Sequence, residues 1–218
     1  MPFAVIFSLA PVLLIALLFF ERRENLKGKL ATKPLLSALF VLTAVCAATM
    51  PFSAYAIVIV IGLVLCLVGD ICLAFPQQTT FRVGLAAFLL GHVAYIAAFA
   101  LAAYPNWGLW IAAAAALPVS SFVYRRLQPH LGGLKTPVMA YIVVITVMVI
   151  AAGGVFGDLH LSMLGRFLVL NGAFSFYLSD IFVARQRFVQ PSFVNRLIGL
   201  PLYYLGQFQI AYTVGLIG

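Results

Sequence analysis

Eight long apolar runs limit how this chain of 218 residues can fold. Hydrophobic residues make up 65% of the sequence, charged residues only 8%, and the mean hydropathy is +1.14. Because a bilayer interior offers no water to backbone N–H and C=O groups, runs of this length cross membranes as helices. We therefore predict an all-α polytopic membrane protein with eight transmembrane helices, forming a single integral membrane domain over residues 1–218. The expected spans are about Phe3–Phe20, Pro34–Met50, Ala54–Phe75, Phe81–Ala103, Trp107–Tyr124, Thr136–Phe156, Leu161–Ala184 and Leu197–Ile217.

The basic residues alternate between successive loops. Twelve of the thirteen Lys and Arg side chains fall in or beside loops one, three, five and seven, and Arg166 is the exception. Since basic loops stay on the cytoplasmic side, both termini are expected outside. The charges of the first run follow its apolar segment, which favours a retained span over a cleaved signal peptide. The net charge of +8 is therefore explained by the basic loops that set the orientation in the membrane. The sequence has no basic stretches interleaved with aromatic residues, so we expect no nucleic-acid partner.

Cysteine and histidine residues give no metal signature. Cys46, Cys66 and Cys72 lie inside apolar runs without a Cys-x-x-Cys pair, which is typical of small packing residues. His92, His130 and His160 are scattered, without the His-Glu-x-x-His spacing of a zinc hydrolase. We therefore predict no metal site and no cofactor.

Two carboxylates lie inside apolar runs. The chain has only five acidic residues, and Asp70 and Asp180 are the two within expected spans. Each follows a small residue, precedes Ile, and lies five residues from a span end at Phe75 or Arg185. At about 1.5 Å per residue, both sit roughly 7 Å inside the cytoplasmic end. Spans three and seven run in the same direction, so the two side chains are expected to form a pair.

A charged side chain at this depth is costly unless it is paired, neutralised or facing water. Intramembrane carboxylates are usually functional, and the alternative is a structural hydrogen bond or ion pair inside the bundle. Two neighbouring carboxyls in a low-dielectric site repel one another, so one can stay protonated near neutrality. One acid and one base arranged in this way can catalyse hydrolysis without a metal.

The fourth span carries further polar candidates. Phe88, His92 and Tyr95 share one helical face by their i, i+4, i+7 spacing, and Gly84 and Gly91 nearby permit close helix approach. A single histidine in a span either makes a structural hydrogen bond inside the helix bundle or forms part of a site with the aspartates.

Further candidates lie at the level of the aspartates and in the last span. Lys33, at the expected start of the second span, is either a snorkelling lysine or a contact to a phosphate headgroup. The candidates in the last span either line a cavity or belong to an aromatic belt, and they are Tyr203, Tyr204, Gln207 and Gln209.

The sequence contains a weak internal repeat. Lys33-Pro34 matches Lys135-Thr136-Pro137, Gly69-Asp70 matches Ser179-Asp180, and Gly91-His92 matches Gly206-Gln207. The pattern indicates a possible parallel repeat of two four-helix halves with the site at their junction, although composition bias in apolar sequences can mimic a repeat.

Taken in order, these motifs resemble the YhhN-like lysoplasmalogenase family. The residues that carry the resemblance are Lys33-Pro34, Gly69-Asp70, Phe81, Gly84, Phe88, His92, Tyr95, Phe176, Ser179-Asp180, Tyr204 and Gln207, and they cover nearly the whole chain. The resemblance implies an eight-helix hydrolase that cleaves the vinyl ether bond of lysoplasmalogens to a fatty aldehyde and glycerophospho-ethanolamine or -choline. Its two catalytic aspartates correspond to Asp70 and Asp180.

The remaining expectations follow from this resemblance. Lys33, His92, Tyr95, Tyr204 and Gln207 are expected to bind a lysophospholipid substrate, and the partners are this lipid and the bilayer. The expected location is the inner membrane of a bacterium, with the active site toward the cytoplasm.

Two other functions fit some of the same residues. A proton-coupled transporter with parallel repeats uses intramembrane aspartates in the same way. An intramembrane aspartyl protease carries Tyr-Asp and Gly-x-Gly-Asp, and the stretches ending in Asp180 and Asp70 match neither motif. Aldehyde release by detergent-solubilised protein separates an enzyme from a transporter.

Overall fold

The computed structural model describes residues 2–217, and all regular structure in that range is helical, which confirms the all-α prediction. The long helices are α1 (Pro2–Arg22), α2 (Leu26–Ala47), α3 (Ala54–Ala74), α4 (Gln78–Ala102), α5 (Trp107–Leu127), α6 (Lys135–Gly157), α7 (Met163–Ala184) and α8 (Phe193–Tyr212). A one-turn helix, α9 (Val214–Ile217), follows α8. Short 3-10 turns at Gln128–His130 and Gly132–Leu134 join α5 to α6, and a π-helical turn (Arg185–Val189) extends α7.

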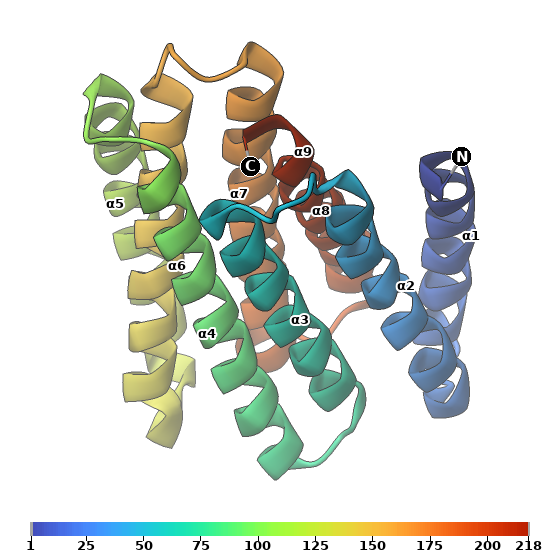
Figure 1. Cartoon of the computed structure of the whole chain (residues 1–218). Coiled ribbons are helices and arrows are strands. Elements are labelled where there is room, and N and C mark those ends of the chain that lie inside the picture. The colour runs from blue at the N-terminus through green and yellow to red at the C-terminus, as the bar shows by residue number, and fades with distance from the viewer. Residues whose placement is uncertain (1, 218) are drawn as a thin grey trace.

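The helices run alternately up and down in one bundle, so that α1 begins and α9 ends at the same end of it (Figure 1). The loops α1–α2, α3–α4, α5–α6 and α7–α8 lie at the opposite end, and they are the loops predicted to be basic. Arg166, the exception, lies at the start of α7, where its guanidinium donates to Phe156 O at 3.1 Å. The protein therefore has one strongly basic end.

Helix length and composition support a membrane protein. Within residues 2–217, seven helices, α1 to α7, are long and apolar enough to cross a bilayer. The helix α8 is not among them, although it has 20 residues. It packs against α1, α2, α3 and α7, and its polar side chains Asn195 and Gln207 are buried there. Its lower apolar content therefore reflects contacts with other helices.

The start of α2 differs from the prediction. We expected the second span to open at Lys33-Pro34, but α2 begins at Leu26, where Asn25 caps it by accepting from Gly28 N at 3.0 Å. Pro34 lies inside the helix. The earlier start adds about two turns. It also moves Lys33 from a helix mouth into the bundle, where it is only 7% exposed.

The helices that carry both aspartates pack as two close pairs, α3 with α4 and α7 with α8. Glycines allow the close approach in each pair. A Cβ atom at Gly91 would lie 3.2 Å from Gly62 O, and one at Gly206 would lie 2.7 Å from Gly172 O. The helix α2 packs on both α3 and α8, while α6 packs on both α4 and α7. These six helices therefore surround a common space.

Candidate active site

A pocket with about 110 Å³ of free volume lies toward the basic end of the bundle. Asp70 and Asp180 both line it, so the structure brings the two predicted aspartates to one site. Its walls are mostly apolar and include Val123, Ile142 and Ile145 from α5 and α6. This volume holds a reacting group and its neighbours rather than a whole phospholipid, since pockets that enclose small molecules measure about 300–1,000 Å³.

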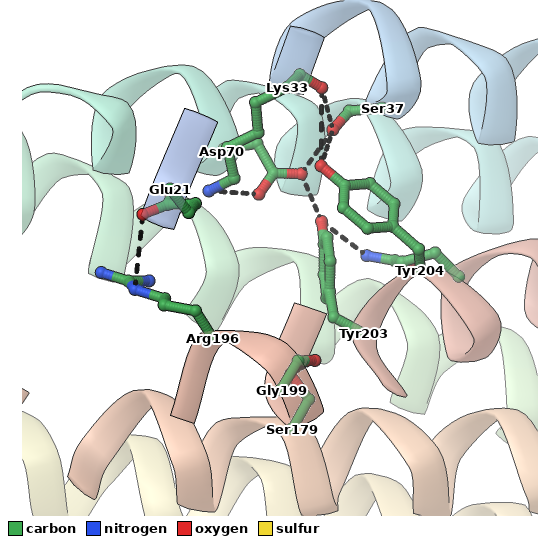
Figure 2. A network of polar contacts seen from close by, with 10 residues as sticks. Glu21, Lys33, Ser37, Asp70, Ser179, Arg196, Gly199, Tyr203 and Tyr204 are labelled. Carbon is green, nitrogen blue, oxygen red and sulfur yellow. Dashed lines mark hydrogen bonds and ion pairs between the residues drawn. The ribbon is translucent and has the colours of Figure 1, made fainter. Parts of the chain in front are cut away.

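Asp70 is saturated by three donors from other helices (Figure 2). Its Oδ1 lies 2.9 Å from Lys33 Nζ. Its Oδ2 accepts from Ser37 Oγ at 2.6 Å and from Tyr203 OH at 2.5 Å. Asp70 is 1% exposed, and a buried charge persists only with such partners. The donors suit an acceptor-only carboxylate and hold α2, α3 and α8 together.

Behind Tyr203, a chain of hydrogen bonds fixes the orientation of its hydroxyl. Gln207 Nε2 donates to Tyr203 OH at 3.2 Å, and Tyr95 OH donates to Gln207 Oε1 at 2.7 Å. Tyr204 OH lies 3.3 Å from Ser37 Oγ on the other side of the network. Every member is buried, so the network fixes Asp70 in one position.

Asp180 has a more open environment. Tyr141 OH donates to its Oδ2 at 2.7 Å, and its side chain is 16% exposed. Within the described residues 2–217, no hydrogen bond reaches Oδ1, and no basic side chain other than His92 lies within ion-pair distance. Asp180 therefore has one oxygen available to a molecule in the pocket.

His92 lies beside Asp180 but does not line the pocket. Its Nδ1 is 2.6 Å from Phe88 O, and only a protonated Nδ1 can donate to that carbonyl. In the neutral ring, Nε2 therefore carries a lone pair. This atom is buried without a hydrogen-bond partner in residues 2–217 and lies 3.8 Å from Asp180 Oδ2. When the Asp180 carboxyl is protonated at Oδ2, a small shift of either side chain lets this O–H donate to His92 Nε2.

Aromatic rings separate the surroundings of the two aspartates. The ring of Phe176 lies 5.1 Å from Tyr203 on the Asp70 side and 4.6 Å from His92 on the Asp180 side. Phe88 packs edge-on against both Tyr203 and Phe176. This packing lets the two carboxylates face one pocket in different environments.

The YhhN family model matches residues 28–214, which is most of the chain and includes both aspartates. The chain belongs to the YhhN family. This finding confirms the resemblance predicted from the ordered motifs. Within residues 2–217, no group of three or more His, Cys, Asp or Glu side chains is placed to hold a metal ion.

Three curated relatives of this YhhN chain carry the same functional name. Lysoplasmalogenase TMEM86B of Sus scrofa is 32% identical over 157 residues, which is 70% of this chain and 62% of that protein. Lysoplasmalogenase of Mycobacterium bovis is 33% identical over 149 residues, 66% of this chain and 53% of that protein. Human lysoplasmalogenase TMEM86A is 31% identical over 160 residues, 70% and 63% of the two chains.

The matched part of the chain spans little more than half the length of these relatives, between 53% and 63% in the three cases. No solved structure gave a significant match.

The other predicted site residues lie around the aspartates rather than in the pocket, with one exception. Lys33 lines the pocket, but its ammonium is paired with Asp70 instead of being available at the membrane surface. Tyr95, Tyr204 and Gln207 belong to the buried network behind Asp70 and do not line the pocket. Their contact with substrate, and that of His92, stays a prediction.

Sequence reasoning missed two residues that contact the aspartates, Ser37 and Tyr141. Ser37 follows Lys33 by one turn on α2, so helical spacing from a predicted residue points to it. Tyr203 is among the cavity candidates of the last span, and it donates to Asp70. Tyr141 carries no such signal, because α6 has no predicted site residue from which to count.

Proposed function

We propose that this protein is a membrane-embedded hydrolase that cleaves the vinyl ether bond of a lysoplasmalogen, giving a fatty aldehyde and a glycerophospho-alcohol. The observation that carries the proposal is the pair of unequal carboxylates facing one apolar pocket in a YhhN family chain. The names of the curated relatives support the same reaction.

The chemistry of a vinyl ether suits this pair. Such a bond resists base and is cleaved by protonation at the β-carbon, which leaves an oxocarbenium ion. Asp180, with an available Oδ1, is the general acid that gives this proton. Water then attacks the cationic carbon and passes one proton back to the Asp180 carboxylate. The resulting hemiacetal releases the glycerol oxygen as an alcohol and leaves the aldehyde.

Asp70 supplies a fixed negative charge near the oxocarbenium ion. Its three donors hold it in place, so no reorganisation is needed when positive charge develops in the pocket. The ion pair with Lys33 makes this buried carboxylate tolerable. Asp180 is therefore the proton donor and acceptor, and Asp70 the electrostatic partner.

The orientation in the membrane follows from the basic end of the bundle. All eight long helices cross the bilayer, α8 included, and the basic loops face the cytoplasm under the positive-inside rule. Both termini then lie outside, and the pocket opens toward the cytoplasmic side of a bacterial inner membrane. The close pairs α3–α4 and α7–α8, each with an aspartate, support a repeat of two four-helix halves.

Purified protein in detergent tests the proposal directly. Aldehyde release from a lysoplasmalogen should be catalytic, and in D₂O the aldehyde should carry one deuterium on the carbon next to the carbonyl. The saturated alkyl ether lysophospholipid is the matched control and should stay intact. Absence of aldehyde, or equal cleavage of an acyl lysophospholipid, would overturn the assignment.

A further inference from the structure

Two arginines line the pocket on the side of the basic loops. Besides Lys33, which is paired with Asp70, the basic side chains lining the pocket are Arg187 and Arg196. Arg187 lies on the π-helical turn, and its guanidinium stacks over the ring of Phe81 at 4.3 Å. Within residues 2–217, no hydrogen bond or ion pair engages this guanidinium. Its donors therefore remain available to a ligand.

Arg196 is only weakly engaged. Its Nε lies 3.8 Å from Glu21 Oε2 (Figure 2). Lys29 Nζ lies 3.9 Å from the same oxygen. A single carboxylate shared at these distances leaves most of the guanidinium donors of Arg196 unused. Arg187, Arg196 and Lys29 therefore carry more positive charge than the single Glu21 carboxylate can balance.

The segment that carries Arg187 is held in place by partly buried hydrogen bonds. Gln186 Oε1 accepts from Ser192 N at 2.8 Å and from Asn195 Nδ2 at 3.0 Å. Asn195, which is 3% exposed, also donates to Gln190 O at 2.8 Å. These bonds tie the turn after α7 to the first turn of α8. Both arginines therefore have fixed backbones.

The spacing from the reactive carboxylate matches a glycerophospholipid. Arg187 follows Asp180 by seven residues, which is two helical turns and roughly 10 Å of rise, and both side chains line the same pocket. In a lysoplasmalogen the glycerol carries the vinyl ether at one end and the phosphate at the other. With the vinyl ether at Asp180, the phosphate reaches the level of the arginines, and the hydrocarbon lies along the apolar α5–α6 wall.

We propose that Arg187 and Arg196 form the binding site for the phosphate group of a single-chain glycerophospholipid, a site that rests on the function proposed above. Guanidinium groups bind phosphate oxygens through two parallel N–H bonds. This site replaces Lys33 as the headgroup contact, because Lys33 is committed to Asp70. It recognises the phosphate itself rather than the choline or ethanolamine beyond it.

Steady-state kinetics test this site in the intact protein. Arg187→Gln and Arg196→Gln should each raise KM for a lysoplasmalogen about tenfold or more, the scale of a lost charge-assisted hydrogen bond, with kcat little changed. The KM for the phosphate-free alkenylglycerol should not change. Arg185→Gln is the matched control, since Arg185 is exposed on the same turn but does not line the pocket. A KM unchanged for the phospholipid, or raised equally for both substrates, would overturn the site.

A binding measurement separates this site from the catalytic proposal. Asp180→Asn protein should bind a saturated alkyl ether lysophospholipid, and the added Arg187→Gln change should weaken that binding about tenfold while the melting temperature stays the same. This result can be obtained even if no vinyl ether is ever cleaved. Equal affinity with and without Arg187 would show that the arginines do not hold the phosphate of the lipid.

Discussion

At the residue scale, the two aspartates differ in what they touch. Lys33, Ser37 and Tyr203 satisfy Asp70, whereas Asp180 has one tyrosine donor and an open oxygen. The sequence predicts both carboxylates, because a charge inside an apolar run is unusual. Their unequal roles are not predictable from it, since Ser37 and Tyr203 resemble ordinary helix residues until the helices are packed.

The buried ion pair gives the first prediction. Lys33→Met should lower the free energy of unfolding by about 3–5 kcal/mol, because it leaves the buried Asp70 carboxylate without its counter-charge. The double variant Lys33→Met with Asp70→Asn should recover much of this loss. Thermal or denaturant unfolding in detergent measures both. Additive losses in the double variant would show that the two side chains do not depend on one another.

His92 gives the second prediction. His92→Phe keeps a ring against Phe176 and Tyr141 but removes the Nε2 lone pair that lies 3.8 Å from Asp180. We expect kcat to fall by about tenfold with KM unchanged, because His92 positions Asp180 rather than contacting substrate. The pH dependence of kcat should also change shape, and His92→Gln should restore part of the activity. A raised KM with normal kcat would instead place His92 in substrate binding.

At the scale of helices, the positions of the elements follow from the apolar runs, because a segment in lipid must satisfy its backbone internally. The start of α2 cannot be predicted from the apolar runs. It depends on a local cap by Asn25 and on tertiary contacts that bury Lys33. The polar content of α8 likewise makes sense only once its neighbours α2 and α7 are known.

Close helix packing gives the third prediction. A Cβ at Gly206 would lie 2.7 Å from Gly172 O and 3.1 Å from Phe176 N, so Gly206→Ala must push α8 away from α7. We expect a loss of about 1–3 kcal/mol in unfolding free energy, with reduced kcat because Tyr203 moves with α8. Gly133→Ala is the control, since nothing lies within 4 Å of its added Cβ. Equal melting temperatures for the two variants would contradict this account of the packing.

At the scale of the whole molecule, the alternating helices bring every predicted basic loop to one end of the bundle. The charge distribution along the sequence predicts this arrangement, because successive loops of an up-and-down helix bundle lie at alternate ends. Which helices become neighbours is not predictable in the same way. The pocket, for example, needs α6 to bring Tyr141 to Asp180, and no motif marks that contact.

Topology gives the fourth prediction. Reporter fusions near Lys29, Gly133 and Gln190 should report a cytoplasmic location, because these positions lie in loops with excess basic residues. Fusions at both termini should report the outside. A cytoplasmic C-terminus would mean an odd number of crossings and would remove α8 from the set of spanning helices.

Hydrolysis by the aspartate variants tests the central claim most directly. Asp180→Asn is nearly isosteric and adds no buried ion. Asp70→Asn would leave the buried Lys33 ammonium without a counter-charge, so it is combined with Lys33→Met. Each of these variants should stay folded and lose almost all aldehyde release from a lysoplasmalogen. Because the two aspartates act as a unit, the variant with both replaced should be barely slower than either of these. Strong additivity of the two losses, or near wild-type turnover by a well-folded single variant, would show that Asp70 and Asp180 do not share a reaction centre.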